Sequence, residues 1–300
     1  MLIVKYKKTF FWISGVIVAL SLGSVLFFGL NFGVDFTGGT LIEVRYTSTV
    51  PSQDAVQSTL SNIGLNGTSI RPAGDEGYII RSGVLSDEQR GSLEEVFSIN
   101  NEYVASVERL NEIGPTIGQE LRNKALIAIV LVSLAIILYI AFTFRGVSKP
   151  VSSWIYGLIA VVALLHDVLV PFGVFALLGH FLGSQVDTLF VMALLAILGY
   201  SVNDTIVVFD RVRENLKNNA DRGRKEEFSL TVGKSLNQTY VRSINTSLTT
   251  LLVLLTLFFL GPEATRDFAL VLMVGVIAGT NSSLALATPL LVAIERRGKN

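Results

Sequence analysis

The sequence predicts an α-helical polytopic membrane protein with six transmembrane helices and one small α+β domain outside the membrane. Three observations lead to this class. Half of the 300 residues are hydrophobic, only 16% are charged, and the mean hydropathy is +0.56. Soluble domains carry about 25% charged residues. Six apolar stretches are long enough to cross a bilayer, and a polar block of about 90 residues separates the first two.

A hydrocarbon core of about 30 Å requires about 20 apolar residues in a helix. We therefore expect helices at 10–30, 125–144, 154–178, 188–209, 242–261 and 268–294, the last five forming one region over 124–294. The first stretch also resembles a signal peptide, because Lys5, Lys7 and Lys8 precede it. Its 21 apolar-rich residues exceed the usual length of such a segment, so a retained helix is expected.

Charge is distributed unevenly along a chain whose net charge is zero. Residues 31–123 hold 6 basic and 13 acidic side chains, whereas residues 210–242 hold 8 basic and 5 acidic side chains. Both termini and residues 145–149 are also basic. Because basic loops remain in the cytoplasm, we expect residues 1–9 and 295–300 to be cytoplasmic and the acidic block to be extracytoplasmic.

The acidic block alternates between short strand and helix patterns. Strands are expected at 40–46, 69–71, 78–81 and 103–110. Ser52 is the expected N-cap of a helix that ends at Gly64, and Ser86 with Gln89 forms a capping box for a helix to Phe97. The order β-α-β-β-α-β is that of ferredoxin-like domains. Its scattered acidic residues predict a solvated surface, with binding of an extended chain or a partner domain as the alternative.

The composition excludes several kinds of chemistry. The chain has no cysteine and two histidines, which excludes disulfides, thiolate metal sites and a cysteine nucleophile. No phosphate-binding loop, zinc motif or nucleophile elbow occurs. We therefore expect no enzyme active site, cofactor or metal. The basic residues of 210–242 are interleaved with acids and are expected to set topology rather than to bind nucleic acid.

Ionisable residues inside a membrane are costly and are therefore functional candidates. Asp204 lies in a polar part of the fourth expected span, and Arg242 opens the fifth span at a similar depth. This spacing fits either a structural ion pair or a proton relay. Asp167 in the third span is either a hydrogen-bonded structural carboxylate or a second step on a proton path. His166 precedes it, but adjacent helical residues point about 100° apart, so the sequence does not imply a pair.

Further polar residues are expected to support a seam among the last three spans. These are Asn203, Thr246, Thr249, Thr250 and Asn281. The three threonines follow Arg242 at positions that share its helix face.

Four segments resemble motifs of the SecD/SecF family of protein-export membrane proteins. They lie at 33–40, 113–118, 199–215 and 238–250, in the order of the family. The signature residues in the first two are Asp35, Gly38, Gly39, Gly114 and Pro115. The segment 199–215 resembles the fourth span of the SecF branch, and 238–250 resembles the start of its fifth span. The resemblance covers nearly the whole chain.

The resemblance implies half of a transporter of the RND superfamily, with a SecD protein as the other half. With SecD, such a chain uses the proton-motive force to promote export of unfolded polypeptides through the SecYEG channel of the cytoplasmic membrane. YajC is a further candidate partner. The family's proton-path residues correspond to Asp204 and Arg242. Two alternatives are a half-transporter for lipids or small molecules, and a passive scaffold in which the polar seam only packs helices.

Overall fold

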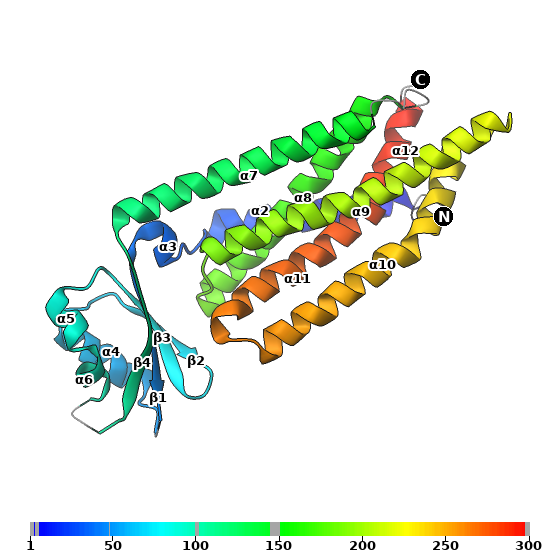
Figure 1. The fold of residues 1–300 in the computed structure, drawn as a ribbon. Coiled ribbons are helices and arrows are strands. Elements are labelled where there is room, and N and C mark those ends of the chain that lie inside the picture. The colour runs from blue at the N-terminus through cyan, green and yellow to red at the C-terminus, as the bar shows by residue number, and fades with distance from the viewer. Residues whose placement is uncertain (1–2, 4–5, 48, 100–101, 145–150, 298–300) are drawn as a thin grey trace. The chain divides into compact units, whose positions relative to one another are not determined.

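The computed structural model describes residues 3, 6–47, 49–99, 102–144 and 151–297 (Figure 1). The chain divides into two compact units. The helical unit consists of Met1–Leu30, Ile127–Ser184 and Leu189–Asn300, and the second unit, the α+β domain, consists of Asn31–Leu126 and Gln185–Thr188. The expected basic loop at 145–149 lies outside the described residues.

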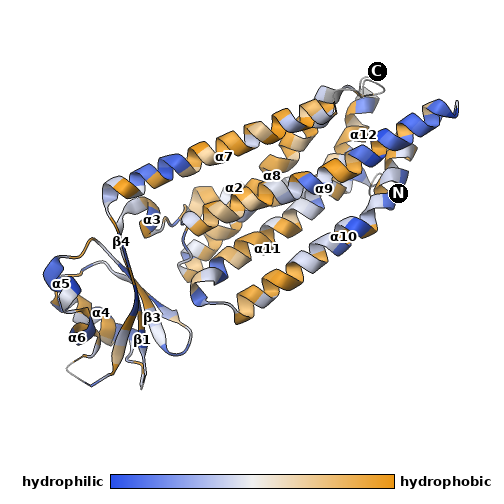
Figure 2. Cartoon of the chain, viewed as in Figure 1, coloured by the Kyte–Doolittle hydropathy of each residue, from blue (hydrophilic) through white to orange (hydrophobic). Residues whose placement is uncertain are grey.

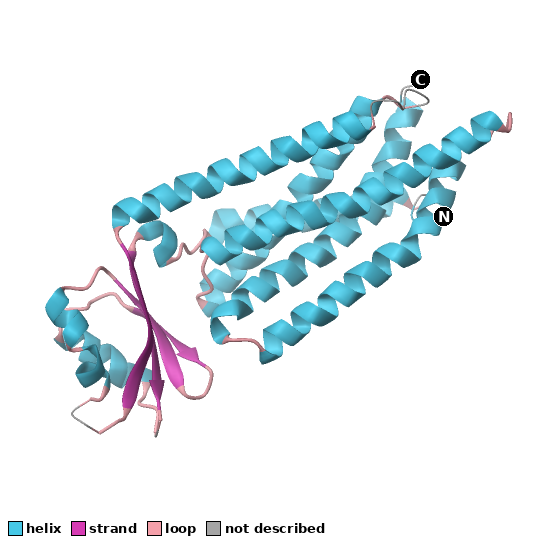
Figure 3. Cartoon of the chain, in the orientation of Figure 1, coloured by secondary structure: helices cyan, strands magenta, loops and turns pink. Residues whose placement is uncertain are grey.

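Within the described residues, six helical segments are long and apolar enough to cross a membrane. Figure 3 draws the helices in cyan and the strands in magenta. The six segments are α2 (Lys7–Phe28), α7 (Pro115–Thr143), α8 (Ser153–Leu182), α9 (Thr188–Asp221), α10 (Phe228–Leu260) and a composite last span. The last span consists of α11 (Arg266–Asn281), a π-helical turn η2 (Ser282–Ala287) and α12 (Thr288–Arg297), after a short 3₁₀ turn η1 (Glu263–Thr265). The six-helix class is therefore confirmed.

Several helices continue well beyond the apolar stretches that predicted them. Helix α9 continues to Asp221 and α10 begins already at Phe228. Figure 2 shows the same change along α9, from apolar residues to a hydrophilic end. Hydropathy identifies only the part of a helix that suits a bilayer, whereas backbone hydrogen bonding continues into polar residues.

Helices α8, α9 and the last span form the core of the helical unit. At least half of the apolar window of each is buried, whereas α2, α7 and α10 leave most of theirs exposed. Glycines allow close approach within this core. A Cβ added to Gly173 would lie 2.3 Å from the Cα of Ser21, and one added to Gly275 would lie 2.2 Å from the side chain of Ile197. The exposed apolar faces are suited to lipid or to further helices.

The α+β domain contains a four-stranded antiparallel sheet. Its strands are β1 (Gly39–Tyr46), β2 (Ser69–Ala73), β3 (Gly77–Ser82) and β4 (Ala105–Ile113), in the order β2-β3-β1-β4. Its helices are α3 (Val34–Thr37), α4 (Gln53–Asn62), α5 (Asp87–Gly91) and α6 (Leu93–Phe97). This strand order, with β-α-β-β-α-β along the chain, is the ferredoxin-like arrangement that the sequence predicts.

Local capping signals place the helices of this domain. The Ser52 hydroxyl accepts a hydrogen bond from the N–H of Ala55, and Ser86 with Gln89 forms the expected capping box. The second expected helix is interrupted after Gly91, a residue with low helix propensity, and continues as α6. Alternate residues of β1 point into the core, so its inner face is buried under these helices.

Candidate functional site

Asp204 lies in the middle of α9, where the helix faces α10. The Ser243 hydroxyl of α10 donates a hydrogen bond to its Oδ1, at 2.6 Å. The other carboxylate oxygen, Oδ2, is buried and has no hydrogen-bond partner in the described part of the chain. One oxygen of this carboxylate is therefore held by α10, while the other is available to a further hydrogen-bond donor.

Arg242 does not close an ion pair with Asp204. No nitrogen of Arg242 lies within 4.0 Å of the carboxylate among the described ion pairs, and its side chain is exposed. Thr246 and Thr249 are exposed as well, and their hydroxyls donate to backbone carbonyls of their own helix. The structure therefore places this face of α10 away from the helices of the chain.

The residues of α10 that face the seam each lie one position after an expected one: Ser243 follows Arg242, and Ser247 follows Thr246. Ser243 and Ser247 are buried, and the Ser247 hydroxyl lies 2.5 Å from the hydroxyl of Thr280 in α11. Tyr200 of α9 donates a hydrogen bond to Ser247 at 3.0 Å. The sequence signal for these residues is the four-residue spacing of two hydroxyls in α10 and of Tyr200 and Asp204 in α9. Of the other expected seam residues, Asn203 is exposed and Asn281 is half-buried.

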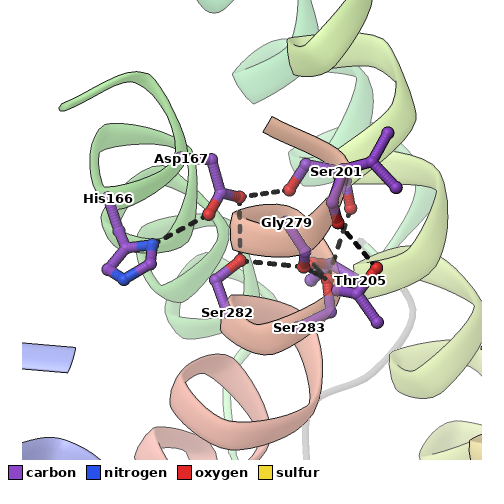
Figure 4. A network of polar contacts seen from close by, with 9 residues as sticks. His166, Asp167, Ser201, Thr205, Gly279, Ser282 and Ser283 are labelled. Carbon is purple, nitrogen blue, oxygen red and sulfur yellow. Dashed lines mark hydrogen bonds and ion pairs between the residues drawn. The ribbon is translucent and has the colours of Figure 1, made fainter. Parts of the chain in front are cut away.

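Asp167 of α8 lies at the centre of a separate, closed network (Figure 4). It is fully buried, and Nδ1 of His166 lies 2.9 Å from its Oδ1. The hydroxyls of Ser201 and Ser282 donate to its Oδ2, the latter at 2.8 Å. His166 thus meets its neighbour through side-chain rotation, although the two residues leave the helix in different directions. Both oxygens of Asp167 are engaged, and three helical segments meet there.

The π-helical turn in the last span shapes this network. Ser282 and Ser283 both donate to the carbonyl of Gly279, at 3.0 and 2.9 Å. The Ser283 hydroxyl also lies 2.9 Å from that of Thr205, beside Asp204 on α9. Such turns often occur at functional sites because they redirect side chains. Helix α9 thus makes polar contacts with α8, with α10 and with the last span.

The signature residues of 33–40 and 113–118 form a joint within the α+β domain. The Asp35 carboxylate accepts hydrogen bonds from the backbone N–H (3.0 Å) and the hydroxyl of Thr188. Gly38 and Gly39 have φ of +77° and +133°, and a Cβ on Gly38 would lie 2.7 Å from the Cα of Pro115. Gly114, by contrast, has open space around it. This role of Asp35 depends on residues far apart in the chain.

The polar groups of the site are mainly hydroxyls and carboxylates. No group of three His, Asp or Glu side chains is placed to hold a metal ion within the described residues. Its two carboxylates lie in different surroundings, since both oxygens of Asp167 are engaged and only one oxygen of Asp204 is. Six apolar helices that bury such carboxylates define a polytopic membrane protein of the transport class.

Two family matches identify the chain. The family described as "Protein export membrane protein SecD/SecF, C-terminal" matches residues 93–297, and the "SecD/SecF GG Motif" matches residues 23–50. The chain belongs to the SecD/SecF family of protein-export membrane proteins. It is thus a multi-pass membrane protein of the protein-export machinery.

Similar proteins place the chain on the SecF side of this family. It is 39% identical to the protein translocase subunit SecF of Thermobaculum terrenum, over 98% of this chain and 94% of the relative. It is 37% identical to SecF of Anaerolinea thermophila, over 96% and 92%. The fused subunit SecDF of Thermus thermophilus is 38% identical over 94% of this chain and 37% of its own length.

Solved structures of SecDF have the same fold. The crystal structure of SecDF from Thermus thermophilus, described as a translocon-associated membrane protein, matches with a TM-score of 0.85 and 35% identity. A structure of SecDF in the Super-membrane-facing form matches with a TM-score of 0.66 and 34% identity. The matches cover 98% and 99% of this chain, which spans 38% of each SecDF chain.

Proposed function

We propose that this chain pairs with a SecD protein and uses the proton-motive force to promote export of unfolded polypeptides through the SecYEG channel. The fused SecDF relatives support the pairing, because they carry this half and further residues in one polypeptide. The SecF relatives support a role in protein translocation rather than in transport of lipids or small molecules. YajC remains a candidate further partner.

The observation that carries the proton-driven part of this proposal is the half-satisfied carboxylate of Asp204. A proton can bind at Oδ2 without displacing a hydrogen bond, because Ser243 engages only Oδ1. The same oxygen can accept a bond from water or from a cation after a small movement of α10 relative to α9. Arg242 precedes Ser243 on α10, so a rotation of α10 about its axis would bring this cation toward the carboxylate. A nearby cation favours the ionised carboxylate.

Useful work requires that Asp204 be reached from the two sides of the membrane in turn. Moving one charge across the full membrane yields about 2.3 kcal/mol per 100 mV. The two SecDF structures match this chain with TM-scores of 0.85 and 0.66 at nearly equal identity and coverage, so this fold is found in more than one arrangement.

The proposed orientation rests on the charge distribution. Residues 1–9 and 295–300 are cytoplasmic, and residues 31–123 are extracytoplasmic, because basic loops remain inside. In this orientation the α+β domain lies where an exported chain emerges, and the basic end of α9 faces the cytoplasm.

The test is Asp204→Asn in the complex with SecD and SecYEG, reconstituted in vesicles. The amide keeps the shape and the acceptor for Ser243 but cannot carry a proton. Proton-driven export and proton conductance should both fall about tenfold or more, with unchanged assembly. The matched control is Asp210→Asn, since Asp210 lies on the same helix in an exposed ion pair with Arg213. Export at the parental rate by Asp204→Asn would exclude this carboxylate as the proton carrier.

A further inference from the structure

The polar seam around Asp204 is bounded on one side by an apolar cluster. Its buried side chains are Leu254 of α10 and Met273 and Val276 of α11. Tyr200 of α9 packs against them, so three helices meet there. We call Leu254, Met273 and Val276 the outer seal. A constriction lined by apolar side chains excludes water, so this cluster closes the seam on its side.

The outer seal and the carboxylate lie at different depths. At 1.5 Å per residue, Tyr200 is about 18 Å and Asp204 about 24 Å from the first residue of α9. Leu254 is about 9 Å and Ser247 about 20 Å from the last residue of α10. In the proposed orientation both of these helix ends are extracytoplasmic, so a proton from that side meets the outer seal before it reaches Asp204.

Tyr200 belongs to both the outer seal and the polar seam. Its side chain packs against the seal, while its hydroxyl donates a hydrogen bond to Ser247 at 3.0 Å. The Ser247 hydroxyl lies 2.5 Å from that of Thr280 and donates to the backbone carbonyl of Ser243 at 2.9 Å. The Tyr200 hydroxyl thus fastens α9 to the pair of helices α10 and α11, one helical turn away from Asp204.

The oxygen of Asp204 that would take the proton is itself buried. This atom is Oδ2, which has no hydrogen-bond partner among the described residues. On the side away from the outer seal lies a second apolar cluster, the inner seal, formed by Val208 of α9, Leu236 of α10 and Leu284 of the π-helical turn. Because Oδ2 is buried between these clusters, one of them must part before a proton from water reaches it.

The two sides differ in how firmly α9 is fastened to α10. On the inner side, the Asn215 amide donates two hydrogen bonds to α10, at 2.8 and 2.9 Å, and the Asn219 amide donates one to Thr231 at 3.2 Å. On the outer side, the bond from Tyr200 to Ser247 is the tie between the two helices that the described residues provide. One hydrogen bond changes an equilibrium about fivefold, so the outer side parts more readily.

We propose that Tyr200 is a positioning residue that controls the access of protons to Asp204 from the extracytoplasmic side. This inference rests on the proposed function. In the closed arrangement the Tyr200 hydroxyl holds Ser247, and the outer seal is shut. When Tyr200 releases Ser247 the outer seal parts, and a hydronium ion gives its proton to Oδ2 of Asp204 and leaves as water. The inner seal stays closed during this step, so the proton does not pass directly to the other side.

The first experiment measures access with a cysteine reporter. The chain has no cysteine, and Thr280→Cys places one thiol behind the outer seal, where Thr280 is buried beside Ser247. A charged, membrane-impermeant methanethiosulfonate is added on the extracytoplasmic side of the complex with a cysteine-free SecD in vesicles. Tyr200→Phe keeps the ring but loses the hydrogen bond, and should raise the rate of modification about fivefold. Tyr200→Ala also removes the ring and should raise the rate further.

Two leucines of α10 provide a matched pair that tests the outer seal itself. Leu254 is 7% exposed and belongs to the seal, whereas Leu252 is 56% exposed. Leu254→Ala should raise the rate of modification of the Thr280→Cys reporter about tenfold or more, because it opens space in the seal, and Leu252→Ala should stay within about twofold of the parent. Proton conductance of the same variants without the reporter should follow the same order.

Two results would overturn this inference. They are equal rates of modification in Leu254→Ala and Leu252→Ala, and a parental rate in Tyr200→Phe. If Tyr200→Ala does not fold, Tyr200→Phe and the leucine pair decide. Modification of the thiol requires no proton flow, so its failure is distinguishable from a failure of the proposed function, which Asp204→Asn tests by conductance in the same vesicles.

Discussion

The two carboxylates that α9 connects differ in how completely the protein satisfies them. Asp167 is fully buried and both of its oxygens are engaged, by His166 and by two serines. Asp204 is half-buried, and its Oδ2 is left without a partner in the described part of the chain. A complete network resists change because every movement breaks a bond. We therefore expect Asp167 to fasten helices and Asp204 to exchange protons.

The largest expected effect is on stability and distinguishes the two sites. Asp167→Ala leaves the buried His166 and Ser201 side chains without an acceptor, at about 1–3 kcal/mol each, whereas Ser282 keeps the carbonyl of Gly279. Asp204→Ala leaves only the Ser243 hydroxyl and should cost about 1–3 kcal/mol. Thermal unfolding in detergent should therefore show a much lower midpoint for Asp167→Ala. Asp167→Asn keeps an acceptor oxygen and should recover part of the loss. Equal midpoints for the two alanine variants would remove the distinction.

A third carboxylate, that of Glu226, lies outside the apolar spans and provides a smaller test of how hydrogen-bond partners affect a carboxylate. Glu226 accepts hydrogen bonds from Lys234 and from Thr231, the latter at 2.8 Å. The bond from Lys234 holds the pKa of Glu226 below its usual range. The ionised form is therefore favoured in the folded state, and its stabilisation is present above about pH 4.3 and lost as the pH falls through the lowered pKa.

The size of this effect follows from exposure. The Lys234 side chain is 54% exposed, and ion pairs near solvent contribute at most about 1 kcal/mol. At pH 7, Glu226→Gln should lower the unfolding free energy by less than that, and the difference should shrink as the pH falls through the lowered pKa of Glu226. The measurement is denaturant unfolding over a series of pH values from 7 downward. A difference that does not change with pH would indicate packing rather than charge.

Sequence reasoning succeeded where the signals are local. The capping box at Ser86 and Gln89, the N-cap at Ser52 and the alternation in β1 lie within a few residues of what they determine. The order of these elements along the chain was sufficient to predict the ferredoxin-like arrangement of the domain. The cost of a charge in a span drew attention to Asp204 and Asp167 in the same way, because it depends only on composition and depth; their roles stay predictions.

Sequence reasoning failed where a contact depends on the direction in which a side chain points or on residues far apart in the chain. Depth along a helix does not determine the face, and a rotation of about 100° per residue brings Ser243 rather than Arg242 to Asp204. Side-chain rotation brings His166 to Asp167. The cap of α9 by Asp35 joins segments 153 residues apart, and no local pattern predicts it.

The most direct test of the account compares proton conductance in two matched variants of the reconstituted complex. Asp204→Asn and Asp167→Asn each replace one carboxylate in a helix by its amide isostere. The account predicts that Asp204→Asn loses proton conductance, whereas Asp167→Asn, once assembled, conducts within a few-fold of the parent. Loss of conductance in Asp167→Asn together with parental conductance in Asp204→Asn would contradict it.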